Sequence, residues 1–174
     1  MQRLYCRPIN FQKNNYNLKI KTMKNLVIID SQNQQGSALG KVLYTAKVNV
    51  LNGREGSAAS DDKRLDINLS APGSKETGTN PEQLFAAGWS ACFIGAMRHN
   101  AAHLQIPLPE KVSVNAEVDL AAGEHGFSLQ ARLFVNLPGL SQEQATFVIE
   151  AAHHTCPYSK ATRGNINVLI TAVI

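Results

Sequence analysis

The alternation of hydrophobic and polar positions predicts five β-strands in this chain. The segments are 41–51, 65–69, 112–120, 127–135 and 166–174. In 65–69, Leu and Ile occupy every second position and polar residues lie between them, as in a strand with one buried face. The dipeptide Asn52-Gly53, which follows the first segment, is typical of a β-hairpin turn. A shorter apolar run at 24–30 is compatible with a further strand.

A long helix is predicted between the second and third of these strands. Asn80 is suited to the N-cap, Pro81 to the first helical position, and Gln83 to a side-chain contact back to the cap. The helix is expected to continue to about Leu104, because Pro107 prevents further helical hydrogen bonding. From Leu84 to Met97 it is apolar almost all round the helix axis, so we expect a core helix that is buried on most sides.

A second, shorter helix is predicted near the C-terminus. The sequence Ser-Gln-Glu-Gln at 141–144 is a capping-box signature, and the helical pattern ends near His154. The order of elements is then β-β-α-β-β-α-β, with antiparallel hairpins and two helices. This order predicts an α+β fold in which sheets pack against helices.

The first 37 residues are interpreted as an N-terminal extension, either flexible or upstream of the true start, followed by a single domain at 38–174. Residues 1–24 hold six of the 17 basic residues and no acidic residue. The rest of the chain has 11 basic against 13 acidic residues, which argues against a nucleic-acid partner. There is no secretory signal, and no apolar run approaches the roughly 20 residues of a membrane-spanning helix. We therefore expect a cytoplasmic protein without a membrane partner.

The three cysteines exclude a disulfide scaffold. Cys6 lies in the extension, which leaves Cys92 and Cys156 in the patterned part of the chain. No Cys-x-x-Cys pair is present, so neither a zinc ribbon nor a thioredoxin motif is available. His153, His154 and Cys156 could be considered as metal ligands, but no further Cys or His cluster completes the set, and we expect no metal site.

The positions of the two cysteines assign them different chemistry. Cys92 lies in the middle of the long helix, where a free cysteine is often simple core packing, and a reactive thiolate there requires a cation from elsewhere. Arg54, in a tight Asn-Gly-Arg-Glu-Gly turn, is the candidate cation, unless it is a solvated turn residue. Glu82 lies in the first helical turn, where the helix dipole alone favours a carboxylate. Cys156 follows a helix C-terminus, which disfavours a thiolate, so it suits a resolving thiol better than an attacking one.

Three stretches carry a resemblance to a known family. The residues TNPEQLFAAGWSACFIGA at 79–96, CPYSKATRGNI at 156–166 and GREG at 53–56 resemble the organic hydroperoxide resistance proteins, a branch of the OsmC/Ohr family of hydroperoxide reductases. The similarity covers about residues 41–174, and the motifs occur in the family's order. Pro-Gly-Leu at 138–140 favours this branch over the osmotically inducible branch proper.

The resemblance implies a fold, an assembly and an activity. The fold is an OsmC/Ohr-like α+β fold, with antiparallel sheets wrapped around a central buried helix in an intertwined homodimer. The activity is the reduction of organic and fatty-acid hydroperoxides to alcohols, with Cys92 as peroxidatic and Cys156 as resolving cysteine. Arg54 would activate the thiolate and Glu82 would orient Arg54. No bound cofactor is implied, because an external dithiol, preferably a dihydrolipoyl group on a lipoylated protein, restores the thiols.

Helix geometry adds a prediction of its own. Glu82 and Cys92 are ten residues apart, which corresponds to about 15 Å along one helix. One arginine does not easily reach both residues within one chain. We therefore predict that each active site is shared between subunits, with two helices packed antiparallel through the small side chains of Ala87, Ala91 and Gly95.

The long helix also offers candidates for an apolar substrate pocket, although core packing is the commoner role of such residues. The candidates are Leu84, Phe85, Phe93 and Ile94. Two features depart from the family: the loop at 70–79 is shorter than in many relatives, and Trp89 stands where another aromatic residue is expected. Two alternatives stay open, an OsmC-type peroxidase with a broader peroxide range and a non-catalytic dimer that binds hydrophobic small molecules.

Overall fold

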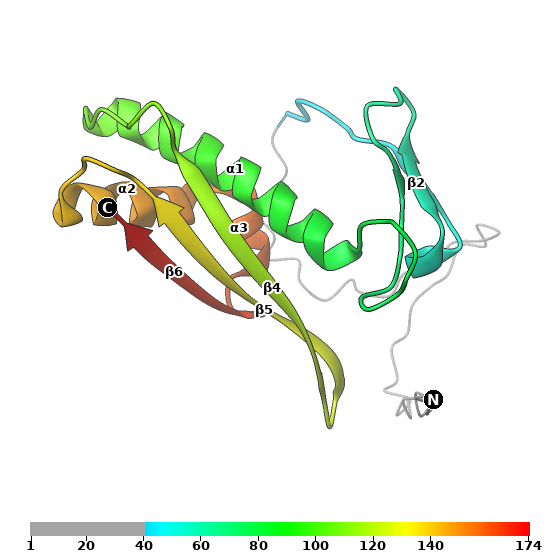
Figure 1. Cartoon of the computed structure of the whole chain (residues 1–174). Coiled ribbons are helices and arrows are strands. Elements are labelled where there is room, and N and C mark those ends of the chain that lie inside the picture. Colours follow the sequence, from blue (N-terminus) through cyan, green and yellow to red (C-terminus); the bar gives the residue numbers. More distant parts are fainter. Residues whose placement is uncertain (1–40) are drawn as a thin grey trace, which may run out of the picture. The chain divides into compact units, whose positions relative to one another are not determined.

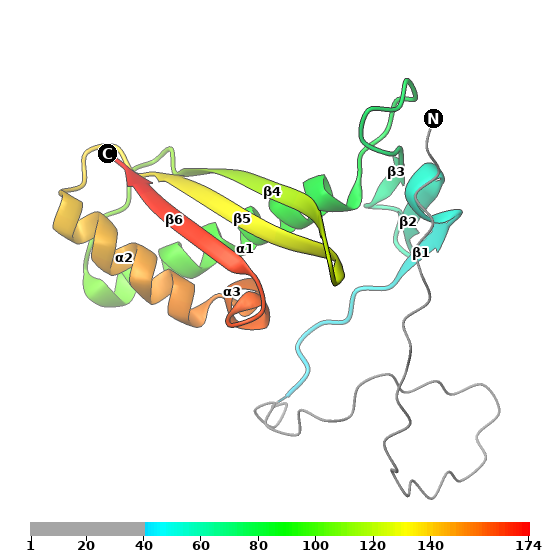
Figure 2. The ribbon, with the colours of Figure 1, turned by 90° about the horizontal axis from the view of Figure 1, so that it is seen from below.

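The structure, a computed structural model, describes residues 41–174 (Figures 1 and 2). Residues 47–174 form one compact unit, and 41–46, which contain no helix or strand, belong to a separate N-terminal unit. The predicted extension at 1–37, the domain start at 38 and the strand at 24–30 lie outside the described residues. Within 41–174, no helix is both long enough and apolar enough to span a bilayer.

The first sheet has the antiparallel order β1 (Val48–Leu51), β2 (Ser57–Ser60) and β3 (Asp66–Asn68). The predicted hairpin turn is confirmed: Asn52 and Gly53 adopt φ values of 56° and 60° and lead into the 3₁₀ turn η1 (Gly53–Glu55). The strand predicted at 41–51 is wrong over residues 41–47, because only its last four residues pair with β2. β2 itself was not predicted, since its sequence Ser-Ala-Ala-Ser has no strong strand preference.

The second sheet has the order β4 (Ser113–Gly123), β5 (Gly126–Asn136) and β6 (Asn167–Val173). β4 and β5 form the predicted antiparallel hairpin, but β6 pairs with β5 in parallel, contrary to the expected antiparallel sheets. The reason lies in the connection between them, which runs through α2 (Gln142–Thr155) and α3 (Pro157–Thr162) and returns the chain to the start of β5. α3 was not predicted, because its six residues are too few for a periodic pattern.

The two predicted helix starts are confirmed by their caps. Asn80 accepts a hydrogen bond from the backbone N–H of Gln83 at the start of α1 (Pro81–Leu104), with Pro81 at the first helical position. The Gln83 side chain does not return to the cap as predicted; it accepts from the hydroxyl of Thr79 instead. Ser141 and Gln144 form the reciprocal capping box of α2.

The core lies between the second sheet and the helices α1 and α2, which cover one face of that sheet (Figure 2). α1 contributes a row of residues spaced four apart, all buried: Trp89, Phe93, Met97 and Ala101. The rest of α1 is less buried than predicted, since its small residues Ala87, Ala91 and Gly95 are exposed in the single chain. α1 is therefore a core helix on one side and an uncovered surface on the other.

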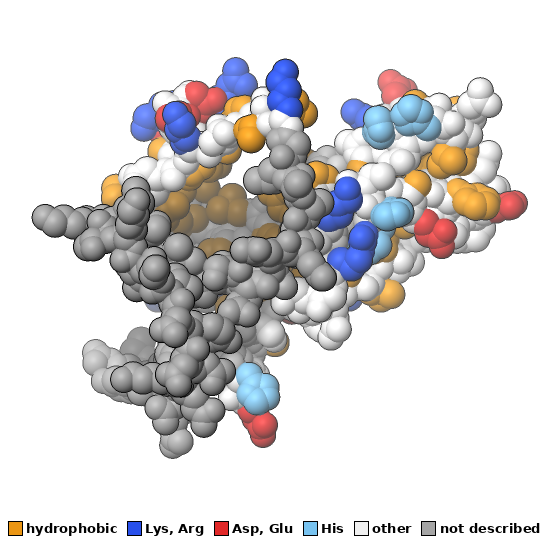
Figure 3. Space-filling view, turned by 180° about the vertical axis from the view of Figure 1, so that it is seen from behind, with side chains coloured by type: hydrophobic (Ala, Val, Ile, Leu, Met, Phe, Trp, Pro, Cys, Tyr) orange, Lys and Arg blue, Asp and Glu red, His pale blue; other side chains and the backbone are white. Residues whose placement is uncertain are grey.

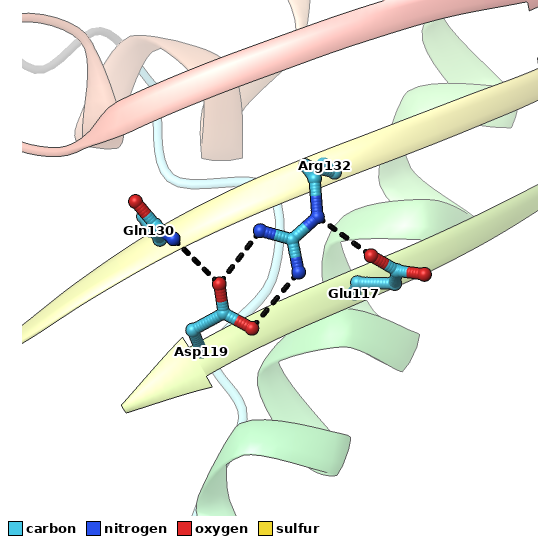
Figure 4. Close-up of polar contacts among 4 residues, drawn as sticks. All are labelled: Glu117, Asp119, Gln130 and Arg132. Atoms are coloured by element: carbon cyan, nitrogen blue, oxygen red, sulfur yellow. Dashed lines mark hydrogen bonds and ion pairs between the residues drawn. The ribbon is translucent and has the colours of Figure 1, made fainter. Parts of the chain in front are cut away.

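The opposite face of the second sheet carries a charged cluster (Figure 4). Arg132 of β5 donates two hydrogen bonds to Asp119 and one to Glu117, and Gln130 donates another to Asp119. In the β4–β5 register Arg132 lies opposite Glu117 and Gln130 lies opposite Asp119, so the Arg132–Asp119 pair is a diagonal one. These bonds hold the pKa of Asp119 at about 2, well below the usual value of a carboxyl group. The cluster thus fixes the register of the hairpin on its polar face.

Candidate functional site

The two cysteines of the described chain lie next to each other, 64 residues apart in sequence. Cys92 is in the middle of α1 and half-buried, and Cys156 is fully buried where α2 ends and α3 begins. Their sulfur atoms are 3.5 Å apart and both thiols are free. A disulfide requires a separation of about 2.05 Å, so a small movement would join them.

Local contacts hold Cys156 in this place. Its backbone N–H donates to the carbonyl of Ala152 at the end of α2, and Pro157 starts α3 directly after it. The indole Nε1 of Trp89 donates to the buried hydroxyl of Ser159 over 3.2 Å. This bond ties α1 to α3 one turn away from each cysteine. Trp89, which the sequence analysis names as a departure from the family, thus stabilises the packing of α1 against α3 near the two thiols.

Tyr158 is a residue of this site that the sequence reasoning missed. Its backbone N–H acts on the thiol of Cys92 and lowers the pKa of that thiol. Its ring lies against α1 at Gly88, where an added Cβ would come within 2.8 Å of the phenol oxygen, and its centroid is 6.0 Å from that of Phe85. A glycine within an apolar helix was the available signal, because such a glycine often permits a close approach.

The surroundings of Cys92 within one chain favour the protonated thiol. Burial raises its pKa, and the neighbouring thiol of Cys156 raises it further, while the N–H of Tyr158 acts in the opposite direction. A neutral thiol is a weak nucleophile, since the thiolate is the reactive form. The described chain alone therefore does not supply the cation that the sequence analysis required.

Arg54 and Glu82 form a second pair. Arg54, in the turn η1, donates from Nη1 to Oε2 over 2.9 Å and from Nη2 to Oε1 over 2.6 Å. The Arg54 side chain is 43% exposed and that of Glu82 only 11%. Arg54 lowers the pKa of the Glu82 carboxyl, so this carboxylate is charged at neutral pH. Among the described side chains, Arg54 hydrogen-bonds to Glu82 alone, so one chain holds two separate pairs rather than one cluster of four.

A mostly apolar groove of about 490 Å³ includes Arg54 in its lining, whereas neither cysteine lines it. It is lined by residues of the first sheet, η1, the start of α1 and α3: Val48, Val50, Gly53, Arg54, Ala58, Leu65, Leu69, Pro81, Leu84, Phe85 and Tyr158. Two of the four pocket candidates, Leu84 and Phe85, line this groove. Phe93 is fully buried in the core and Ile94 packs against the core, and neither lines the groove.

The histidines near Cys156 form no metal centre in the structure. Within residues 41–174, no group of three His, Cys, Asp or Glu side chains is arranged to hold a metal ion. His153 is half-buried, and burial, followed by the positive charge of Arg163, lowers its pKa.

Comparisons with known proteins identify relatives of this chain in sequence and in structure. Residues 72–171 match the family model described as OsmC-like protein. The organic hydroperoxide resistance protein of Xanthomonas axonopodis pv. citri is 47% identical over 135 residues, covering 75% of this chain and 95% of the relative. The crystal structure of the organic hydroperoxide resistance protein OhrB of Bacillus subtilis has 43% identity and a TM-score of 0.72, covering 76% of this chain and all of that one. An organic hydroperoxide resistance protein from Elizabethkingia anophelis has 40% identity and a TM-score of 0.71, covering 76% of this chain and 98% of that one.

Proposed function

Since this chain belongs to the OsmC-like family, among the organic hydroperoxide resistance proteins, we propose that it is a thiol peroxidase that reduces organic hydroperoxides to alcohols. The observation that carries the proposal is the pair of free thiols, with sulfur atoms 3.5 Å apart. Cys92 is half-buried and Cys156 is fully buried, so Cys92 is the thiol that we expect substrate to reach. The proposed peroxidatic residue is Cys92 and the resolving residue is Cys156.

The first step is a nucleophilic displacement on oxygen. The thiolate of Cys92 attacks the distal oxygen of the hydroperoxide, the O–O bond breaks, and the leaving alkoxide takes up a proton to become the alcohol. Cys92 is oxidised to a sulfenic acid and the peroxide is reduced by two electrons. Negative charge moves from sulfur to the leaving oxygen, so a fixed cation beside this path stabilises the transition state.

The second step forms the disulfide, and an outside dithiol removes it. The Cys156 sulfur attacks the Cys92 sulfenic acid, the S–O bond breaks and water leaves. The close approach of the two sulfur atoms supports this assignment. An external dithiol then returns both cysteines to thiols by exchange and is itself oxidised to a disulfide. A dihydrolipoyl group is the proposed donor, in the cytoplasm, with no bound cofactor required.

We propose that Arg54 reaches Cys92 across a homodimer. Within one chain the pKa of Cys92 is raised, while Arg54 is held by Glu82. An antiparallel α1 pair would bring the Arg54–Glu82 pair of one subunit to the Cys92 of the other. The exposed small residues of α1 support such packing: a Cβ added to Gly95 would meet no atom of the described chain within 4 Å. The guanidinium would then bind carboxylate and thiolate at once, which lysine could not do.

The apolar groove supports alkyl hydroperoxides as substrates rather than hydrogen peroxide. Its walls are aliphatic and aromatic side chains, with Arg54 as the charged group among them. An alkyl chain gains by leaving water for such a groove, whereas hydrogen peroxide has no apolar surface to bury. A preference for organic over hydrogen peroxide is the expected result.

The test is the consumption of cumene hydroperoxide with dihydrolipoamide as reductant, measured beside Cys92→Ser and Cys156→Ser. Turnover is expected in the wild type and loss of turnover in Cys92→Ser. Cys156→Ser is expected to react once, to a sulfenic acid that a dimedone probe labels. A folded and fully reduced wild-type protein without turnover would instead favour a binding protein for hydrophobic molecules. Equal rates on hydrogen peroxide would favour the broader OsmC-type peroxidase.

A further inference from the structure

Two side-chain hydrogen bonds tie the segment around Cys156 to α1. Asn100 donates from Nδ2 to the hydroxyl of Thr155, one residue before Cys156, over 2.7 Å. Trp89 donates to the hydroxyl of Ser159, three residues after Cys156, over 3.2 Å. Both donors belong to the helix that carries the other cysteine. The segment is therefore fastened to that helix on both sides of the buried thiol.

The Asn100–Thr155 bond belongs to a continuous chain of hydrogen bonds. The amide of Asn100 also donates to the carbonyl of Ala96 over 2.8 Å. The Thr155 hydroxyl, which accepts from Asn100, donates its own proton to the carbonyl of Ala151 over 2.9 Å. Since a carbonyl only accepts, Nδ2 and not Oδ1 of Asn100 must face Ala96. The chain thus has one direction, and it is anchored on the backbone of α1 at one end and of α2 at the other.

This chain of hydrogen bonds lies near the surface of the single chain. Thr155 is exposed and Asn100 is half-buried. Figure 3 views the side of the second sheet on which α1 and α2 lie, and polar side chains, His among them, are exposed there. A hydrogen bond that is open to water contributes little to folding, because water can replace either partner. Its loss is therefore expected to change where Cys156 lies more than whether the protein folds.

The position of Cys156 decides how fast the disulfide closes. The two sulfur atoms lie 3.5 Å apart and must approach by about 1.5 Å to bond. In closure, the Cys156 sulfur attacks the Cys92 sulfenic acid, the S–S bond forms, the S–O bond breaks, and the hydroxide leaves as water with the proton of the Cys156 thiol.

A competing reaction does not involve Cys156. The Cys92 sulfenic acid takes one oxygen from a second hydroperoxide, which leaves as the alcohol, and becomes a sulfinic acid. The second hydroperoxide is reduced by two electrons and the sulfur is oxidised by two. A sulfinic acid is not returned to the thiol by dithiols, so this reaction inactivates the cysteine. Any displacement of Cys156 slows closure and thereby favours over-oxidation.

We propose that Asn100 and Thr155 are positioning residues that hold Cys156 within reach of the sulfenic acid and so limit over-oxidation. The inference rests on the proposed function and adds two residues to its second step. Among residues 41–174, the side-chain hydrogen bonds of Asn100 and Thr155 run to each other and to helix carbonyls, and none involves Cys92. The two residues therefore act on the reaction through Cys156, whose backbone directly follows Thr155. A displacement of about 1 Å can cost up to about 100-fold in the rate of such a step.

The experiment removes the bond from either side in the reduced, full-length protein. Thr155→Val keeps the shape of the side chain without its hydroxyl, and Asn100→Ala removes the donor at a position where alanine favours the helix. After one equivalent of cumene hydroperoxide, acid quenching and mass spectrometry follow the disulfide. We expect closure to be about tenfold slower in each variant, and no slower in the double variant, because both changes remove the same bond. Thr155→Ser keeps a hydroxyl and should restore the wild-type rate.

Thr146→Val is the matched control. Thr146 is another exposed threonine of α2, and its hydroxyl also donates to the carbonyl four residues earlier, that of Gln142, over 2.8 Å. It accepts from the side chain of Gln142 in the same helix rather than from α1. Removal of this hydroxyl repeats the local change in α2 without touching the tie to α1, so closure should keep the wild-type rate. An equal slowing in Thr146→Val would overturn the inference.

Over-oxidation gives a second readout that a merely structural role would not move. Closure and over-oxidation compete for the same sulfenic acid, so the hydroperoxide concentration that converts half of Cys92 to sulfinic acid in one cycle is proportional to the closure rate. In Thr155→Val this concentration should fall by the same factor as the closure rate, with the sulfinic acid identified by mass. An unchanged concentration in Thr155→Val would contradict the positioning role.

The outcomes separate this inference from the proposed function. If hydroperoxide produces neither a sulfenic acid nor a disulfide in the wild type, the proposed function fails. If the wild type closes its disulfide and both Thr155→Val and Asn100→Ala close theirs at the same rate, the positioning role is refuted and the proposed function stands. A double variant slowed by the product of the two single effects would also refute it, because two independent changes and not one bond would then be the cause.

Discussion

Arg54 and Glu82 come from elements 28 residues apart and meet through two hydrogen bonds of 2.9 and 2.6 Å. The carboxylate is nearly buried at the start of α1, while the arginine stays 43% exposed. Each residue shifts the pKa of the other toward its charged form. Glu82 thus fixes the direction of a guanidinium that still faces outward and can meet another group.

The first prediction concerns the geometry of this cation. Arg54→Lys keeps the charge but loses the two-pronged contact with Glu82. We expect kcat/KM for cumene hydroperoxide to fall about 100-fold, as when one preorganised donor is removed from an active site. The alkylation of Cys92 should also need a higher pH. Arg64→Lys is the control, because Arg64 is a highly exposed hairpin residue that pairs with Asp62. An unchanged pH profile of alkylation in Arg54→Lys would contradict the role given to Arg54.

The second prediction concerns the sharing of the site. Ala91→Glu places a charge on the exposed small face of α1, and we expect a folded monomer by sedimentation. Without the partner's Arg54, burial and Cys156 leave the pKa of Cys92 raised, so the thiol stays protonated to higher pH. The midpoint of its alkylation by iodoacetamide should then lie above that of the wild type. Gln142→Glu, an exposed position in the first turn of α2, is the control. A monomer with the wild-type midpoint would show that one chain completes the site.

The third prediction concerns the contact between Gly88 and Tyr158. In Gly88→Ala the new methyl group would lie 2.8 Å from the phenol oxygen, so the ring must move. Because Tyr158 follows Cys156 by two residues and its N–H lowers the pKa of the Cys92 thiol, we expect slower closure of the Cys92–Cys156 disulfide after one peroxide equivalent. Stopped-flow fluorescence of Trp89, the single tryptophan of the chain, measures this closure.

The matching double variant tests whether the phenol is the cause. Gly88→Ala with Tyr158→Phe lacks the oxygen at 2.8 Å and keeps the ring carbon Cζ at 3.3 Å as the nearest contact, so closure should recover part of its rate. Alanine is also favoured over glycine in a helix by about 1 kcal/mol, so urea unfolding should find the double variant at least as stable as Tyr158→Phe. A closure rate that stays low in the double variant would show that the loss does not come from this contact.

The fourth prediction concerns acid stability. Asp119 has a pKa of about 2 in the folded chain, below its ordinary value of 3.8, because Arg132 and Gln130 hydrogen-bond to its charged form. A lowered pKa stabilises the fold above the ordinary value, and this contribution is lost as the pH falls from about 3.8 to about 2. The difference in urea midpoint between wild type and Asp119→Asn should therefore shrink over this window. Glu124→Gln, in the turn after β4, is the control. If the difference in urea midpoint between wild type and Asp119→Asn does not change with pH, the prediction is wrong.

The two long helices and most strands were predictable because their signals are local. Asn80 and Ser141 cap the helices they were expected to cap, since a cap needs only the next three residues. β2 and α3 were missed for the opposite reason: Ala58 and its neighbours have little strand preference and are held by pairing with β1 and β3. The parallel pairing of β6 depends on the path through α2 and α3, which no local pattern contains.

The candidate site divides in the same way. By itself the sequence determined the residue types, namely two cysteines, an arginine in a tight turn and a glutamate at a helix start, and their resemblance to a family. Tertiary structure alone decided that Cys92 and Cys156 lie 3.5 Å apart, that the Tyr158 ring packs against α1 at Gly88, and that Arg54 binds Glu82. The physical reason is distance along the chain: capping and periodicity act over a few residues, whereas contacts across 28 or 64 residues exist only once the core has packed.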